Sequence, residues 1–221
     1  MGIKDRMKRL LGKEKAVNVK HKFTEIHDKN LFHGVESVSG TGSDMVQTEE
    51  IRKRIPELIE KYGITSVMDA PCGDFFWMRH VDLGGGVKYV GIDIVESLIE
   101  KNNQEHSDGT HSFACIDIIE GDLPKVDLII CRDCLVHLTY DQAINAIRNF
   151  KGSGAKYLLT TTFPGRENRD LGDIIWRPLD LQEAPFSLPE PVELINEKCT
   201  EDDMRFTDKS LGMWDLSFIE I

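Results

Sequence analysis

Three aspartates stand at the ends of short apolar runs in the chain, at Asp69, Asp93 and Asp117. The first is followed by a tight turn, Ala70-Pro71-Cys72-Gly73, and then by Asp74. A carboxylate can accept hydrogen bonds from a ribose diol and stabilise a cation. A phosphate would be disfavoured here, because the acids add negative charge and the proline lacks an N–H donor. The pattern therefore favours a cationic adenosyl ligand over a nucleotide phosphate.

A second polar group follows the apolar run that ends at Cys131. His137 could take a proton near neutral pH, which suits activation of a hydroxyl acceptor, or it could tie the turn to the next helix. Asp133 could orient that histidine or act as the base itself, and its alternative is a helix N-cap. Cys131 and Cys134 form a lone C-x-x-C pair, for which we favour small apolar residues at a strand end over a zinc or redox site.

Two further segments carry groups that suit an acceptor. Residues 164–191 contain three arginines, which indicate a planar anion such as phosphate or carboxylate, or else surface ion pairs. Residues 39–43, Ser-Gly-Thr-Gly-Ser, offer hydroxyl and N–H groups that could close over an anion, or else a flexible linker. The predicted acceptor-binding residues are Ser43, Arg132, Arg166, Arg169, Trp176 and Arg177.

The elements that would position these residues alternate between strands and helices. Strands are predicted at 66–69, 88–93, 112–117, 127–131 and 156–163, and helices at 48–62, 75–80, 95–103 and 141–150. Pro56 predicts a kink or a later start for the first helix. Residues 192–199 and 212–221 read as two final strands, antiparallel to each other. The fold class is therefore α/β, a three-layer αβα Rossmann-like sandwich whose mostly parallel, seven-stranded sheet has a terminal antiparallel strand. Ligands bind at the carboxyl ends of such strands, where the acids lie.

Composition limits the partners. The 221 residues carry a formal charge of −11, and residues 1–22 are basic while the remainder is acidic. An acidic body does not suit a broad nucleic-acid surface, so no nucleic-acid partner is expected. The basic segment could rest weakly on anionic lipid or on a partner, or it could be a frayed terminus. No apolar run approaches a membrane span, and five cysteines without a secretory signal predict a cytoplasmic protein.

The segments Val67–Asp74, Tyr89–Asp93 and Cys115–Ile118 resemble the first three motifs of the class I S-adenosylmethionine-dependent methyltransferases. Only the middle glycine of the first motif, Gly73, is kept. The departure argues against a dinucleotide site, which needs glycines for close approach of a pyrophosphate. The resemblance implies that S-adenosylmethionine is the cofactor and is held by Asp69, Ala70, Pro71, Cys72, Gly73, Asp93, Ile94, Asp117, Ile118 and Cys131.

Individual roles also follow from this resemblance. It implies that Asp93 accepts both ribose hydroxyls and that Asp117 accepts from the adenine amino group, between Ile94 and Ile118. Cys131 would pass close to the methionine part of the cofactor. The alternatives are a solvent-facing acid for Asp93 and, for Asp117, a helix cap beside core isoleucines.

The resemblance further implies the reaction. We expect an O-methyltransferase with a small polar and possibly anionic acceptor (a sugar, sugar phosphate or phosphoramidate), loosely similar to bacterial members associated with surface polysaccharides. His137 and Asp133 are its candidate catalytic residues, and no metal is required. Residues 47–221 would form the methyltransferase domain, 164–191 its lid, and 1–46 a basic cap or linker. An N-methyltransferase of an amine or protein side chain, and a binding module without activity, remain open.

Overall fold

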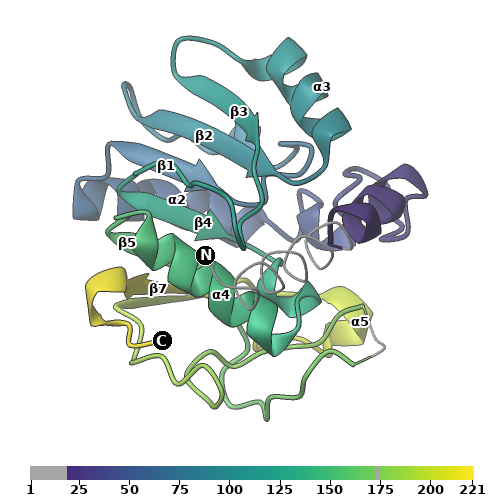
Figure 1. Cartoon of the computed structure of the whole chain (residues 1–221), viewed down its shortest axis with the longest axis vertical. Helices are drawn as coiled ribbons and strands as arrows, with labels where there is room; N and C mark the ends of the chain where they lie inside the picture. Colours follow the sequence, from purple (N-terminus) through teal and green to yellow (C-terminus); the bar gives the residue numbers. More distant parts are fainter. Residues whose placement is uncertain (1–18, 173–174) are drawn as a thin grey trace, which may run out of the picture.

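The computed structural model describes residues 19–172 and 175–221, and its centre is a seven-stranded sheet (Figure 1). The strand order is β3-β2-β1-β4-β5-β7-β6. The strands are β1 (Ser66–Asp69), β2 (Lys88–Asp93), β3 (His111–Cys115), β4 (Leu128–Cys131), β5 (Tyr157–Thr162), β6 (Glu193–Asn196) and β7 (Ser210–Asp215). The α/β fold class is confirmed. The last strand, β7, does not lie at the edge, because it inserts between β5 and β6 and pairs antiparallel with both.

Helices cover both faces of this sheet. They are α2 (Glu49–Tyr62), α3 (Glu96–His106), α4 (Tyr140–Gly152) and the short α5 (Glu201–Met204), with a further helical segment over 19–28. Four 3₁₀ turns are η1 (Thr41–Ser43), η2 (Met78–His80), η3 (Leu135–His137) and η4 (Leu216–Phe218). In the described ranges, none of the helices combines the length and apolar character that a bilayer crossing requires.

Local sequence explains where α2 ends and where α4 begins. Gly63 ends α2 in the left-handed conformation and donates its N–H to the carbonyls of Ile59 and Glu60. Pro56 lies inside α2, so the later start that it predicted is wrong. Thr139 and Gln142 form a capping box at the start of α4.

The predicted helix over 75–80 is reduced to the 3₁₀ turn η2. Phe75 has φ 56°, a left-handed conformation that a right-handed helix cannot include. The turn still buries apolar side chains, since Phe75, Trp77 and Met78 pack in the same core cluster as α2. This short element therefore does the packing of a helix on that face of the sheet.

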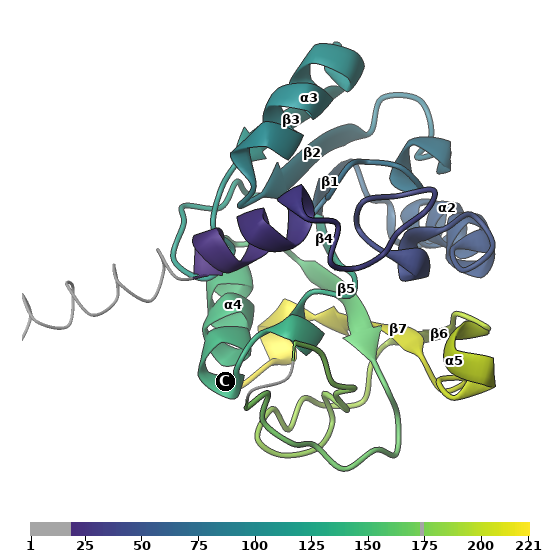
Figure 2. The same ribbon diagram turned by 90° about the vertical axis from the view of Figure 1, so that its right-hand side faces the viewer.

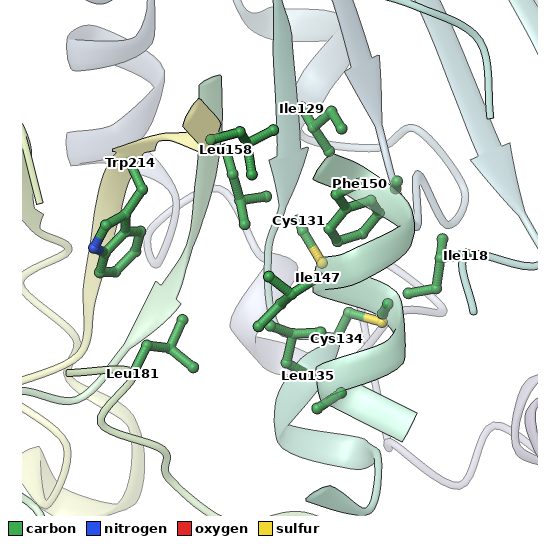
Figure 3. Packing of buried hydrophobic residues seen from close by; sticks show 14 of the residues in the cluster. Ile118, Ile129, Cys131, Cys134, Leu135, Ile147, Phe150, Leu158, Leu181 and Trp214 are labelled. Carbon is green, nitrogen blue, oxygen red and sulfur yellow. The ribbon is translucent and has the colours of Figure 1, made fainter. Parts of the chain in front are cut away.

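The segment 164–191 covers the other face of the sheet. Leu179, Leu181, Phe186 and Leu188 are buried in one cluster with α4 and Trp214. Figure 3 shows Leu181 and Trp214 on the side of this cluster away from Phe150, and Figure 2 shows the segment at the opposite end of the sheet from α3. Its described residues form no helix. Part of this segment therefore belongs to the core, and its predicted role as a lid stays a prediction.

Candidate active site

A cleft lies at the carboxyl ends of the central parallel strands. It includes Asp69, Asp93 and Asp117 from the chain that ends or follows β1, β2 and β3, together with Asp133 and Cys134 after β4. About 1140 Å³ of empty space lies within it, counting the part that is open to solvent. The arrangement brings the predicted strand-tip acids to one place.

The turn after β1 is fixed by backbone hydrogen bonds. The N–H of Ala70 donates to the carbonyl of Ile130 at 2.8 Å, and the N–H of Cys72 donates to the carbonyl of Ile92 at 2.8 Å. These bonds tie the turn to β4 and β2. They account for its fixed place in the cleft wall, where Pro71, Cys72 and Gly73 line the space.

Gly73 is held from both sides. Its N–H donates to Asp93 Oδ2 at 3.1 Å, and its carbonyl accepts from Asn102 Nδ2 of α3 at 2.8 Å. Its φ of 53° is left-handed. The one glycine kept from the motif is thus at a position whose left-handed backbone favours glycine. Asn102 helps to hold this turn, and the sequence patterns did not identify it.

Asp69 and Asp93 are buried carboxyl groups in the same cleft. Burial raises the pKa of Asp69 to about 7, although its carboxylate accepts from the Tyr89 hydroxyl at 2.9 Å. Burial also raises the pKa of Asp93, whose Oδ1 accepts the N–H of Val95 at 2.9 Å. Burial disfavours the ionised forms of both carboxyl groups, and a cationic ligand beside them would stabilise those ionised forms.

The residues predicted to hold adenine also line the cleft. Asp117, Ile94 and Ile118 all face it. Asp117 Oδ1 accepts the N–H of Ile119 at 2.8 Å, which fixes the carboxylate in a local turn rather than at a helix start. The ribose and adenine roles stay predictions, but their residues are together.

Cys131 differs from its prediction. It is fully buried in the core cluster, and Figure 3 shows its side chain beside Ile147 and Phe150. It is absent from the cleft lining, whereas Cys134 is present. The cause is strand alternation: the last residue of β4 points into the core, and the chain must turn before a side chain reaches the cleft. Among the described residues no cluster of three or more His, Cys, Asp or Glu side chains could hold a metal ion.

Asp133 belongs to a buried ion cluster at the end of β4. Its Oδ2 accepts from Lys209 Nζ at 2.6 Å, and Arg132 Nη1 lies 3.3 Å from the same oxygen. Burial alone would raise the pKa of Asp133, but Lys209 and Arg132 lower it to about 2. A carboxylate so stabilised is a poor general base. The prediction of Asp133 as the base therefore loses support.

Arg132 lines the cleft but is fully engaged. Its guanidinium binds Glu197, with Nη2 at 2.7 Å from Oε2, and Nη2 also donates to the carbonyl of Gly42 at 2.8 Å. Its group lies 5.6 Å from the Trp77 ring centroid. Glu197 follows β6, and Lys209 precedes β7. No sequence pattern pointed to either residue, because it is the insertion of β7 that brings them to this edge.

His137 lies in the cleft wall with one fixed tautomer. Its Nδ1 lies 2.6 Å from the carbonyl oxygen of Ile175, so Nδ1 carries the proton and Nε2 keeps a lone pair. Burial lowers the pKa of His137 to about 4. The ring packs at 4.9 Å from that of Phe32. A neutral histidine with a free nitrogen at the cleft is compatible with a base.

The arginines of 164–191 are not where the anion-clamp prediction places them. None of them lines the cleft. Arg166 forms a bidentate ion pair with Asp208, and Arg169 forms an exposed pair with Glu167 at 3.6 Å. The alternative interpretation, ion pairing, is the one that these two arginines follow.

Arg177 and Trp176 are also placed elsewhere. Arg177 is buried and donates to the carbonyls of Leu135 at 2.9 Å and Arg169 at 3.2 Å, so it ties the segment to η3. The Trp176 ring packs edge-on against Phe163 at 5.8 Å and Phe206 at 4.9 Å. These contacts engage the three arginines within the protein, although Arg177 Nη2 is buried without a hydrogen-bond partner among the described residues. The clamp role stays a prediction that this geometry does not favour.

The Ser/Gly loop, residues 39–43, is held in the wall of the cleft by hydrogen bonds of the residues just before it. Asp74 accepts from Ser37 Oγ at 2.8 Å and from the Val38 N–H at 3.0 Å. Ser39 and Ser43 line the cleft, as the latter's prediction requires. A Cβ placed on Gly73 would lie 2.2 Å from Ser39 Oγ. These contacts contradict the flexible-linker interpretation.

The segment before that loop closes another side of the cleft. Val19, Phe23, Ile26, His27 and Phe32 line it. The sequence patterns assigned none of these residues to the site. Val19, Phe23 and Ile26 are spaced so that they lie on one face of a helix, and such an apolar stripe indicates burial. The surface role predicted for residues 1–22 lies mostly outside the described residues.

No family model matches the chain, and no curated protein matches it. Solved structures do match. The N-methyltransferase NodS from Bradyrhizobium japonicum WM9, in complex with S-adenosyl-l-homocysteine, is 17% identical with a TM-score of 0.57, over 76% of this chain and 87% of that one. Human N-acetylserotonin methyltransferase in complex with SAM is 11% identical with a TM-score of 0.56, over 76% and 52%.

Magnesium protoporphyrin IX methyltransferase from Synechocystis PCC 6803 with bound SAM is 18% identical, with a TM-score of 0.52 over 70% of this chain and 78% of that one. The matched region spans 52% of the length of the [4+2]-cyclase SpnF, and 58% of the Synechocystis enzyme in its structure with SAH. These likenesses show that the chain has the fold of class I S-adenosylmethionine-dependent methyltransferases.

Proposed function

We propose that the protein is a methyltransferase that uses S-adenosylmethionine to methylate an oxygen of a small polar acceptor. One observation carries the proposal: Asp69, Asp93 and Asp117 meet in one cleft at the strand ends of this fold. The buried carboxyls of Asp69 and Asp93 have raised pKa values, so a cation placed beside them would stabilise their ionised forms. That chemistry fits a cofactor with a sulfonium and an ammonium.

We assign the cofactor's parts by this geometry. Asp93 would hold the ribose, Asp117 the adenine edge, and Ile94 and Ile118 the adenine faces. The turn at 70–73 would hold the methionine part, with Cys134 in the place predicted for Cys131. When bound, the cofactor supplies an electrophilic methyl group on a sulfonium. The protein's part is alignment and exclusion of water, because the displacement at carbon discharges an existing charge.

His137 is the proposed general base. Its Nδ1 donates to the Ile175 carbonyl, so Nε2 is free to receive a proton from a hydroxyl. Its low pKa keeps it neutral at pH 7 and makes it a modest base. Residues 47–221 would carry the reaction, and residues 19–46 would close the cleft. We propose a cytoplasmic location, and a sugar of a surface polysaccharide as one candidate acceptor.

A test of this function begins with a screen of methyl transfer from tritiated S-adenosylmethionine. With an acceptor that the screen shows to be methylated, His137→Ala should lower turnover by roughly 10²–10⁴-fold, the usual contribution of a general base, and leave cofactor affinity unchanged. The matched control is His80→Ala, an exposed histidine outside the cleft. Turnover within a few-fold of wild type would make His137 structural. Lost cofactor binding would show that it holds the fold.

A further inference from the structure

The acceptor end of the cleft has a charge pattern that limits what it can bind. Five carboxylates line the described cleft, at Asp69, Asp74, Asp93, Asp117 and Asp133, against one guanidinium, that of Arg132. A cationic cofactor accounts for the acids at the strand tips of β1 and β2. The side beyond them, formed by the residues after β4, is where an acceptor must approach.

Arg132 is not available to an anion. Nε and Nη2 are bound by Glu197, Nη2 also reaches the Gly42 carbonyl, and Nη1 faces Asp133. The side chain is only 3% exposed. An incoming phosphate or carboxylate would have to break a buried ion pair, which is costly because it strands the partner charge.

Asp133, by contrast, offers a free acceptor atom. Lys209 and Arg132 both occupy Oδ2, while the contact of Oδ1 among the described residues is a long one, 3.5 Å from Thr161 Oγ1. The side chain is 25% exposed and lines the cleft. The backbone is held at φ 51°, an uncommon conformation for a non-glycine residue and one often found at functional sites.

His137 provides a second acceptor on the same wall. Since its Nδ1 is used by Ile175, its Nε2 accepts and does not donate. Asp133 and His137 are four residues apart on the turn that contains η3, and both line the cleft. The cleft lining therefore presents two hydrogen-bond acceptors and a carboxylate held ionised. Two cationic side chains lie near His137, Lys22, whose Nζ donates to the His137 carbonyl at 3.3 Å, and Arg177, but neither lines the cleft.

We infer that the methyl acceptor is a small molecule that donates at least two hydrogen bonds and carries no anionic group. This inference rests on the proposed function, and it gives that function a substrate class, polyols and amino polyols without an anionic group. Asp133 Oδ1 would accept one hydrogen bond from the substrate and so orient it. His137 Nε2 would accept the proton of the group that is methylated. An anionic acceptor would meet a like charge and an unavailable arginine.

The experiment reads the charge of the product directly. The full chain is incubated with tritiated S-adenosylmethionine and a small-molecule extract of its source cells. Unreacted cofactor is removed on charcoal, and the product is separated by ion exchange into anionic, neutral and cationic fractions. Cofactor binding is measured separately by calorimetry. Label in the neutral or cationic fraction is the expected result.

The decisive variant is Asp133→Asn. Asparagine tolerates the left-handed backbone, so the fold should persist, and its amide can still accept from Lys209 while it presents a donor to the cleft. We expect transfer efficiency to fall by about 10- to 100-fold, as for a lost hydrogen bond to a charged group. Cofactor affinity should be unchanged, while the melting temperature should fall, because a neutral amide no longer balances the charges of Lys209 and Arg132. Asp122→Asn, the same change at an exposed site outside the cleft, is the control.

The possible outcomes distinguish the proposed substrate class from the proposed methyl-transfer function. Label in the anionic fraction, or full efficiency in a folded Asp133→Asn, overturns the substrate class and leaves methyl transfer standing. Cofactor binding with no label in any fraction contradicts transfer to a small molecule. No cofactor binding contradicts the proposed function itself.

Discussion

Replacing Gly73 by alanine tests whether the turn after β1 holds the cofactor. Gly73 has φ 53°, and Gly63, the cap of α2, has φ 62°. An alanine in this left-handed region costs roughly 1–2 kcal/mol of stability. Both variants should therefore lose a similar free energy of unfolding. They differ in their surroundings, because a Cβ on Gly63 meets nothing within 4 Å, whereas one on Gly73 lies 2.2 Å from Ser39 Oγ.

That contact makes the two variants a matched pair. The Ser39 side chain is exposed and can rotate, so the clash should add little to the stability loss. It should instead displace Ser39 and crowd the turn that faces the cleft, and weaken S-adenosylmethionine binding by about 1–2 kcal/mol, or about 5- to 30-fold. Calorimetry and urea unfolding measure both quantities. Equal cofactor affinity in Gly73→Ala and Gly63→Ala would show that the turn after β1 does not hold the cofactor.

Two further predictions concern the buried acids. Asp93→Ala should weaken cofactor binding by about 1.5–3 kcal/mol, the range for hydrogen bonds to a charged group, and unchanged affinity in a folded variant would refute the ribose assignment. Below a pH of about 7 the Asp69 carboxyl holds a proton in the free protein, because burial raises its pKa. A cationic cofactor favours the carboxylate, so affinity should rise from pH 5.5 towards 7 and then level, with proton release seen by calorimetry in two buffers; an equal rise in Asp69→Asn would assign it to another group.

Much of the sheet could be predicted from sequence. The bounds of β1 and β2 match their predicted ranges, because each is a buried apolar run that ends in an acid. The same pattern placed Asp69, Asp93 and Asp117 at one edge, which the cleft confirms. These features are local in the chain or follow from the rule that parallel strands share a direction.

What could not be predicted depends on remote pairings. Arg166 lies 42 residues from its partner Asp208, and Arg132 lies 65 residues from Glu197. The sequence around a charged residue does not indicate whether its side chain binds a ligand or another part of the chain. The place of β7 decided these pairs, and nothing in its sequence distinguishes an inserted strand from an edge strand.

We propose that this cleft holds S-adenosylmethionine through its strand-tip acids. Calorimetric titration of the full chain with S-adenosylmethionine, S-adenosylhomocysteine and NAD measures this binding. We expect saturable binding of the first two compounds at one site, competition between them, and no binding of NAD. Binding of NAD, or no binding of either adenosyl compound by the folded protein, would contradict it.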